Sequence, residues 1–235
     1  MPAKPRSSDH SAAALRWADR ALTREVETRQ GLARAHVHEP AGPGGRPLGV
    51  LVLGHGAGGG VGAPDLRAAV TAATSAGWRA VLVEQPWRVA GRRVAPAPPR
   101  LDEAWLAVVD ALREPPQAPD VVDPLVVGGR SAGARVACRT AAGLGAVAAL
   151  GLAFPLHPPG RPDRSRAPEL AAAGVPVVVV QGERDAFGGP GEIIALRLDH
   201  VEVVPAPGDH ALRSAGRAVA DGVRLALGRG RAHSG

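Results

Sequence analysis

A serine, an aspartate and a histidine occur in this order along the chain, and together they could carry out nucleophilic catalysis. Ser131 stands between Gly129 and Gly133, after the apolar run 125–127 and before small residues that favour a helix. This spacing is typical of a sharp strand-to-helix turn that presents a serine hydroxyl at its apex. With 31 glycines in the chain, such a pentapeptide also arises easily by chance, so its value depends on its surroundings.

The partners that a serine nucleophile requires appear later in the sequence. His210 precedes the last expected helix and is predicted to be the general base that takes the serine proton. Asp185 follows the apolar run 175–180 and is predicted to orient that histidine, since the carboxyl ends of parallel strands collect catalytic groups. Glu183 and Asp209 are the competing acids and rank below Asp185.

A glycine tract at 56–60 follows the apolar run 48–54. Acyl transfer requires backbone N–H groups that point at the developing oxyanion, and a glycine-rich turn lets the main chain approach closely enough to provide one. We predict the N–H of Ala57 or Gly56 as one donor and that of Ala132 as the other. A phosphate-binding loop is disfavoured because the tract does not end in Lys followed by Ser or Thr.

Further residues are candidates for a substrate pocket: His55, Arg130, His157, Trp87, Arg92, Arg93 and Phe187. His55 and His157 could equally be structural residues, and arginines on the loop 86–99 are more often solvated than bound to an acidic substrate. No histidines and carboxylates show the spacing of metal ligands on one element, so neither a metal nor another cofactor is expected.

Strand-like apolar runs alternate with helical segments along the chain, which predicts an α/β fold. We expect about seven to eight strands in a mostly parallel sheet with helices on both faces, in one domain over residues 11–228. Residues 1–10 and 229–235 are expected to be disordered tails. The connection 154–174 is too short for a large cap domain, which predicts an open or shallow site.

The net charge of +6 does not indicate a nucleic-acid-binding protein, because the arginines are scattered and tyrosine is absent. No secretory signal and no apolar run of membrane-spanning length is evident, so no membrane span is predicted. The single cysteine, Cys138, excludes an internal disulfide framework. These features together predict a cytoplasmic protein.

The chain resembles the α/β-hydrolase superfamily, and more narrowly a small, cap-poor branch that includes the testis-expressed hydrolase-like protein and the hydrolase-like domain of an NSL-complex subunit. The residues that carry the resemblance are 55–59, 91–93, 96–99, 129–133, 154–160, 181–188 and 208–210. The resemblance implies an eight-stranded, mostly parallel sheet and a serine triad. It implies no particular substrate.

Three functions are compatible with these patterns. The favoured one is a serine hydrolase that forms an acyl-enzyme on Ser131 from a small-molecule ester or thioester with a small acyl group. The second is a binding or scaffold protein that keeps the fold without useful turnover. The third is an acyltransferase that uses the same three residues. The sequence does not indicate an oligomeric state.

Overall fold

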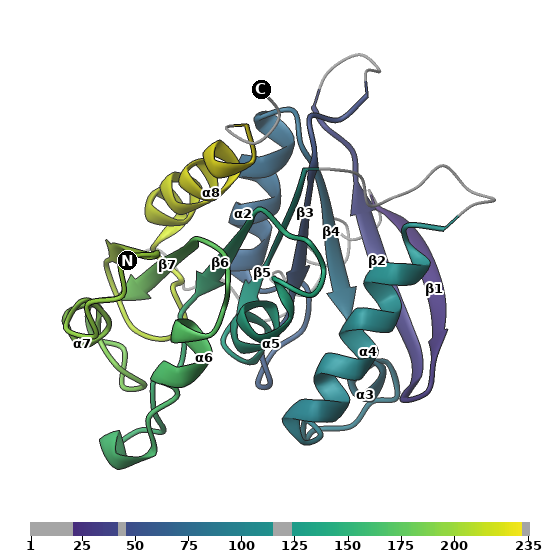
Figure 1. The fold of residues 1–235 in the computed structure, drawn as a ribbon. Coiled ribbons are helices and arrows are strands. Elements are labelled where there is room, and N and C mark those ends of the chain that lie inside the picture. Colours follow the sequence, from purple (N-terminus) through teal and green to yellow (C-terminus); the bar gives the residue numbers. More distant parts are fainter. Residues whose placement is uncertain (1–20, 42–45, 115–123, 232–235) are drawn as a thin grey trace, which may run out of the picture.

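The structure is a computed structural model that describes residues 21–41, 46–114 and 124–231. Its centre is one eight-stranded sheet with the order β1-β2-β4-β3-β5-β6-β7-β8 (Figure 1). The pairs β1–β2 and β2–β4 are antiparallel, and all other neighbouring strands are parallel. The strands are β1 (Leu22–Thr28), β2 (Gly31–His38), β3 (Val50–Gly54), β4 (Arg79–Glu84), β5 (Leu125–Arg130), β6 (Ala148–Leu152), β7 (Val177–Gly182) and β8 (Val201–Ala206).

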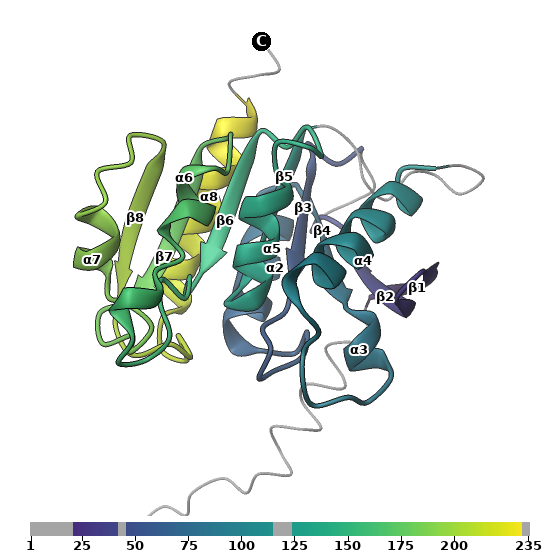
Figure 2. The same ribbon diagram turned by 60° about the horizontal axis from the view of Figure 1, so that its bottom comes forward.

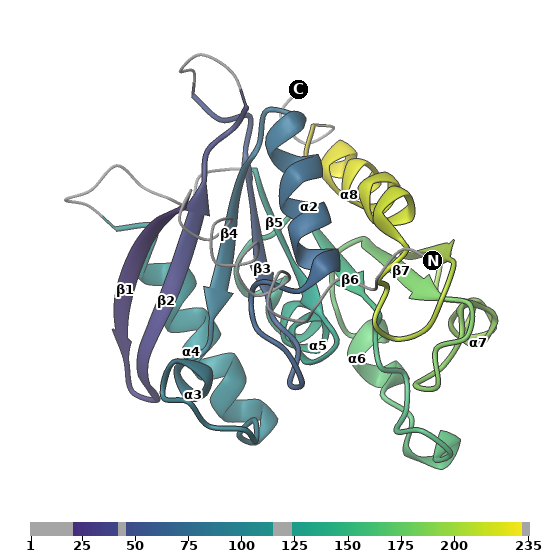
Figure 3. The same ribbon diagram turned by 180° about the vertical axis from the view of Figure 1, so that it is seen from behind.

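Helices cover both faces of the sheet. The helices α4, α5 and α6 lie in front of it in Figure 1, and the view from behind in Figure 3 shows α2 and α8 side by side on the opposite face. The helices are α2 (Pro64–Ser75), α3 (Pro86–Val89), α4 (Pro98–Ala111), α5 (Ala132–Thr140), α6 (Ala167–Ala171), α7 (Pro190–Ile194) and α8 (Gly216–Arg231).

The five central parallel strands are buried on both faces, which explains why they read as continuous apolar runs rather than as alternating patterns. Two hydrophobic clusters result, one on each side of the sheet. Trp105 of α4 and Val136 of α5 belong to the first cluster, whereas Leu66 of α2 and Val219 of α8 belong to the second. The helices are thereby fixed against the sheet over most of their apolar surface.

The carboxyl ends of the parallel strands meet at the lower edge of the sheet in Figure 1, and Figure 2 brings this edge forward. The loops after β3, β5 and β7 carry the predicted oxyanion, nucleophile and acid residues. No separate cap domain covers this edge within the described ranges, and the connection from β6 to β7 contains only a short 3-10 turn and α6.

The expected α/β sheet with helices on both faces is confirmed, and the sheet has eight strands. Two local expectations differ from the structure. The loop 86–99 contains α3 and the first turn of α4, since Pro86 and Pro98 each start a helix. The final helix begins at Gly216 and extends to Arg231, where an ion pair of Arg229 with Glu202, 3.0 Å long, links its last turns to β8. Residues 229–231 are therefore helical, whereas 1–20 and 232–235 lie outside the described residues.

Candidate active site

Ser131 occupies a strained turn between β5 and α5. Its backbone has φ 52° and ψ −108°, a region that non-glycine residues rarely adopt. There is no room for a side chain at positions 129 and 133. A Cβ at Gly129 would lie 2.5 Å from the carbonyl oxygen of Gly54, and a Cβ at Gly133 would lie 2.3 Å from the same oxygen. The two glycines thus let α5 start directly against β3, and the serine is held at the apex.

The three predicted residues are joined by hydrogen bonds. The Nε2 atom of His210 lies 3.0 Å from Oγ of Ser131, and its Nδ1 atom lies 2.8 Å from Oδ2 of Asp185. The side chain of Asp185 is fully buried, whereas that of His210 is about 20% exposed. With Asp185 accepting the Nδ1 proton, Nε2 is left to accept the serine proton.

A buried amide holds the aspartate in place. Nε2 of Gln181, the penultimate residue of β7, donates to Oδ2 of Asp185 at 3.0 Å, and it also lies 2.6 Å from the carbonyl oxygen of Gly188 and 3.2 Å from that of Phe154. The backbone N–H of Phe187 donates to Oδ1 of Asp185 at 2.8 Å. Both carboxylate oxygens therefore have fixed partners in addition to the histidine.

The loops after β7 and β8 are in close contact. The N–H of Arg184 donates to the carbonyl of Gly208 at 2.9 Å, and a Cβ on Gly182 would lie 2.6 Å from the carbonyl oxygen of Asp209. The ring of Phe187 packs on that of His210 with centroids 4.2 Å apart. The acid loop therefore positions the histidine through its side chains and through its main chain.

The glycine loop after β3 lies against the nucleophile. A Cβ at Gly56 would be 3.4 Å from Cβ of Ser131. Nε2 of His55 accepts the N–H of Gln85 at 3.1 Å, so Nδ1 carries the ring proton and donates it to the carbonyl of Gly56 at 2.9 Å. Burial lowers the pKa of His55, which keeps the ring neutral. Both ring nitrogens are therefore occupied, and His55 shapes the loop.

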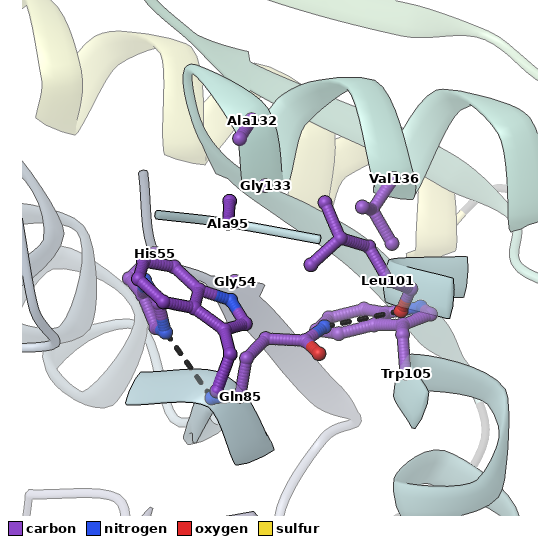
Figure 4. Close-up of a pocket in the computed structure, with 10 residues that line it drawn as sticks. Gly54, His55, Gln85, Ala95, Leu101, Trp105, Ala132, Gly133 and Val136 are labelled. Atoms are coloured by element: carbon purple, nitrogen blue, oxygen red, sulfur yellow. Dashed lines mark hydrogen bonds between the residues drawn. The ribbon is translucent and has the colours of Figure 1, made fainter. Parts of the chain in front are cut away.

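A small pocket lies beside this loop, between α5 and the ends of β3 and β4 (Figure 4). Its volume is about 10 Å³, close to the space that one water molecule requires. Three polar atoms of its lining side chains are buried and have no hydrogen-bond partner in the described part of the chain: Oε1 of Gln85, Nε1 of Trp87 and Nε1 of Trp105. The lining residues are Gly54, His55, Gln85, Trp87, Ala95, Leu101, Trp105, Ala132, Gly133 and Val136.

The remaining candidates lie in several places. Trp87 and His55 line the pocket, and Phe187 contacts His210. Arg92 and Arg93 are exposed on the loop before α4 and do not line the pocket. His157 is held by Glu192 at 3.0 Å and by the carbonyl of Pro158 at 2.9 Å, which makes it a structural link near the acid loop.

Neither competing acid bonds to the ring of His210, whose two nitrogens contact Asp185 and Ser131. Glu183 and Asp209 are exposed, and Oδ1 of Asp209 accepts the N–H of Ala211. Arg130 does not line the pocket, since its guanidinium forms an ion pair with the buried Asp65.

Sequence reasoning missed two of the residues that organise this site. Gln181 carried a signal, because it is the one polar residue after an apolar run and stands four positions before Asp185. Asp65 carried none, since an acidic residue in the first turn of a helix is ordinary. In the described ranges, no group of three or more His, Cys, Asp or Glu side chains could hold a metal ion. Of the helices in those ranges, none is long and apolar enough to cross a membrane.

The strand order, the serine turn and the site at the carboxyl edge define a protein with the architecture of an α/β hydrolase. The family model described as "Alpha/beta hydrolase domain" matches residues 47–222, which is more than half of the chain, so the protein belongs to this family. A comparison with curated protein sequences found no match.

Solved structures share this fold at low sequence identity. A lidless α/β serine hydrolase from Xanthomonas campestris has a TM-score of 0.70 and 20% identity, over 89% of this chain and 94% of that chain. Est1E from Butyrivibrio proteoclasticus has a TM-score of 0.68 and 16% identity, over 88% and 98%. An esterase from Pyrobaculum calidifontis has a TM-score of 0.64 and 19% identity, over 96% and 91%.

Proposed function

We propose that the protein is a serine hydrolase that cleaves carboxylic esters or thioesters with short acyl groups. The observation that carries this proposal is the 3.0 Å contact between Oγ of Ser131 and Nε2 of His210, with the other ring nitrogen on a buried carboxylate. A serine hydroxyl becomes a useful nucleophile only when a base within this distance accepts its proton. The esterases and serine hydrolases that share the fold support the same class of reaction.

In the proposed mechanism, Oγ of Ser131 attacks the carbonyl carbon of the substrate while its proton passes to Nε2 of His210. The resulting oxyanion accepts hydrogen bonds from the N–H of Ala132 and from that of Gly56 or Ala57. When the intermediate collapses, the bond to the leaving group breaks, and His210 gives its proton to the departing alcohol or thiol. Water then attacks the acyl-enzyme while its proton passes to Nε2 of His210. As this second intermediate collapses, the bond to Oγ of Ser131 breaks, His210 returns the proton to Oγ, and the acid is released.

The pocket beside Ala132 supports a preference for small acyl groups. Two of its lining residues, Ala132 and Gly133, directly follow Ser131, and its volume of about 10 Å³ leaves little room for a long acyl chain. Acetyl esters are therefore the first substrates to test. We also propose that the protein belongs to the small, cap-poor branch that its sequence motifs resemble. A cytoplasmic location is proposed because the single cysteine is buried and forms no disulfide.

The test is a panel of p-nitrophenyl esters and acyl thioesters of increasing chain length, measured with wild type and with Ser131→Ala. We expect the highest kcat/KM for the two-carbon acyl groups, a steep fall beyond four carbons and no turnover by the variant. A fluorophosphonate probe should label wild type and leave Ser131→Ala unlabelled. Labelling of the variant would refute the assigned nucleophile. A wild-type protein that is inactive on the whole panel and is not labelled would favour a scaffold role.

A further inference from the structure

Arg130 is the last residue of β5 and directly precedes Ser131, yet its side chain turns away from the pocket. Its Nε atom lies 2.8 Å from Oδ2 of Asp65, and only 14% of the arginine side chain is exposed. The side chain of Asp65, in the first turn of α2, is completely buried. A charged pair is therefore enclosed behind the nucleophile turn.

The same guanidinium reaches the catalytic histidine through the main chain. Its Nη2 atom donates to the carbonyl oxygen of His210 at 3.1 Å. On its other side, Nη1 lies so close to Gly56 that a Cβ there would come within 2.8 Å. One side chain thus contacts α2, the glycine loop and the loop that carries His210.

An enclosed ion pair is a poor source of stability, because the cost of removing both charges from water often exceeds their attraction. Burial raises the pKa of Asp65, although the positive charge of Arg130 acts in the opposite direction. Replacing such a pair by apolar side chains of similar volume is often neutral or stabilising. The arrangement is better explained by the geometry that it imposes on the loops around the serine.

We propose that Arg130, fixed by Asp65, is a positioning residue that holds the backbone of His210 in place during the reaction. This inference rests on the proposed function. Before the reaction, the His210 ring is held by both Ser131 and Asp185. Once Ser131 is acylated, its hydroxyl proton is gone and that contact weakens, whereas the bond from Arg130 to the carbonyl of His210 is unaffected. The imidazole then remains where water must be activated.

The experiment compares Arg130→Met, Arg130→Lys and Asp65→Asn with wild type on p-nitrophenyl acetate. Active sites are counted by fluorophosphonate titration, so that kcat refers to folded, reactive molecules. A displaced base costs about 10- to 100-fold in kcat, with KM changed by no more than about threefold. Arg130→Lys keeps the charge but cannot span Asp65 and His210 together, so we expect an intermediate loss.

Arg79→Met is the matched control. The Arg79 side chain is 12% exposed and forms an ion pair with Glu39. Arg79 is the first residue of β4, so it lies at the end of the strands opposite to the site. It should lose stability and keep kcat per active site. Arg130→Ala with added ethylguanidinium provides a second readout, since a small guanidinium that fills the vacated site should restore kcat. Arg130 and Asp65 variants with wild-type kcat per active site, or a loss without rescue, would overturn the positioning role. A wild type that the fluorophosphonate does not label would instead overturn the proposed hydrolase itself.

Discussion

Replacing Gln181 by leucine tests how the site keeps Asp185 in place. The Gln181 side chain is fully buried. Its amide nitrogen carries two protons and lies within hydrogen-bond distance of three acceptor oxygens. Leucine removes about two hydrogen bonds and leaves the buried carbonyls of Phe154 and Gly188 without this donor. At about 1 to 3 kcal/mol for each of these two buried carbonyls, the free energy of unfolding should fall by about 2 to 6 kcal/mol.

The catalytic consequence should be separable from this loss of stability. Asp185 keeps the N–H of Phe187 and His210 as partners, so we expect kcat to fall by about tenfold rather than vanish. Val179→Ala is the matched control, because Val179 is fully buried two residues earlier on the same strand. It should cost about 2 kcal/mol and leave kcat unchanged.

The measurements are urea unfolding at pH 7 and the steady-state hydrolysis of p-nitrophenyl acetate per titrated active site. If Gln181→Leu keeps its unfolding free energy within about 1 kcal/mol of wild type and its kcat within about twofold, then the amide does not hold the aspartate. A loss of stability equal to that of Val179→Ala, with full activity, would assign Gln181 to the core alone.

Three further predictions follow from individual residues. Gly133→Ala places a Cβ 2.3 Å from the carbonyl oxygen of Gly54 and should cost more than about 3 kcal/mol in urea unfolding, whereas Gly143→Ala, with its nearest atom at 3.7 Å, should be tolerated. Burial lowers the pKa of His38 to about 4 from an unfolded value of about 6.5, so protons bind preferentially to the unfolded chain in this window. The free energy of unfolding should therefore fall by on the order of 3 kcal/mol as the pH drops from 6.5 to 4. His38→Gln should reduce that fall. If the variant shows the same pH dependence of unfolding as wild type, His38 is not its source. Burial also raises the pKa of Cys138 to about 12, so the native protein should not react with a thiol reagent at pH 8 and should react fully in urea; rapid labelling without urea would show that the thiol is accessible.

The positions of the nucleophile turn and of the acid and base loops were predictable because each depends on local rules. Glycines at 129 and 133 are required by the close approach of α5 to β3, and that requirement is visible in the sequence. Asp185 and His210 could be selected because both follow apolar strands whose carboxyl ends share one edge of the sheet.

The direction of long side chains was not predictable. Arg130 is adjacent to Ser131 in sequence, which suggested a pocket residue. Its flexible side chain instead forms an ion pair with the buried carboxylate of Asp65, 65 positions earlier in the chain. Arg92 and Arg93 were placed on the correct loop, whereas their exposure depends on how α3 and α4 shorten that loop. The pocket likewise combines residues from β3, α3, α4 and α5, a combination that becomes visible only once the helices are packed.

The most direct test of the central claim is the mass of the peptide that contains Ser131, after the protein is mixed with p-nitrophenyl acetate and quenched with acid within the first turnover. We predict that this peptide gains one acetyl group in wild type and that Ser131→Ala gains none. His210→Gln should accumulate the adduct far more slowly, because the serine then has no base to accept its proton. An acetyl group on a different residue, or turnover without any adduct, would contradict the proposed mechanism.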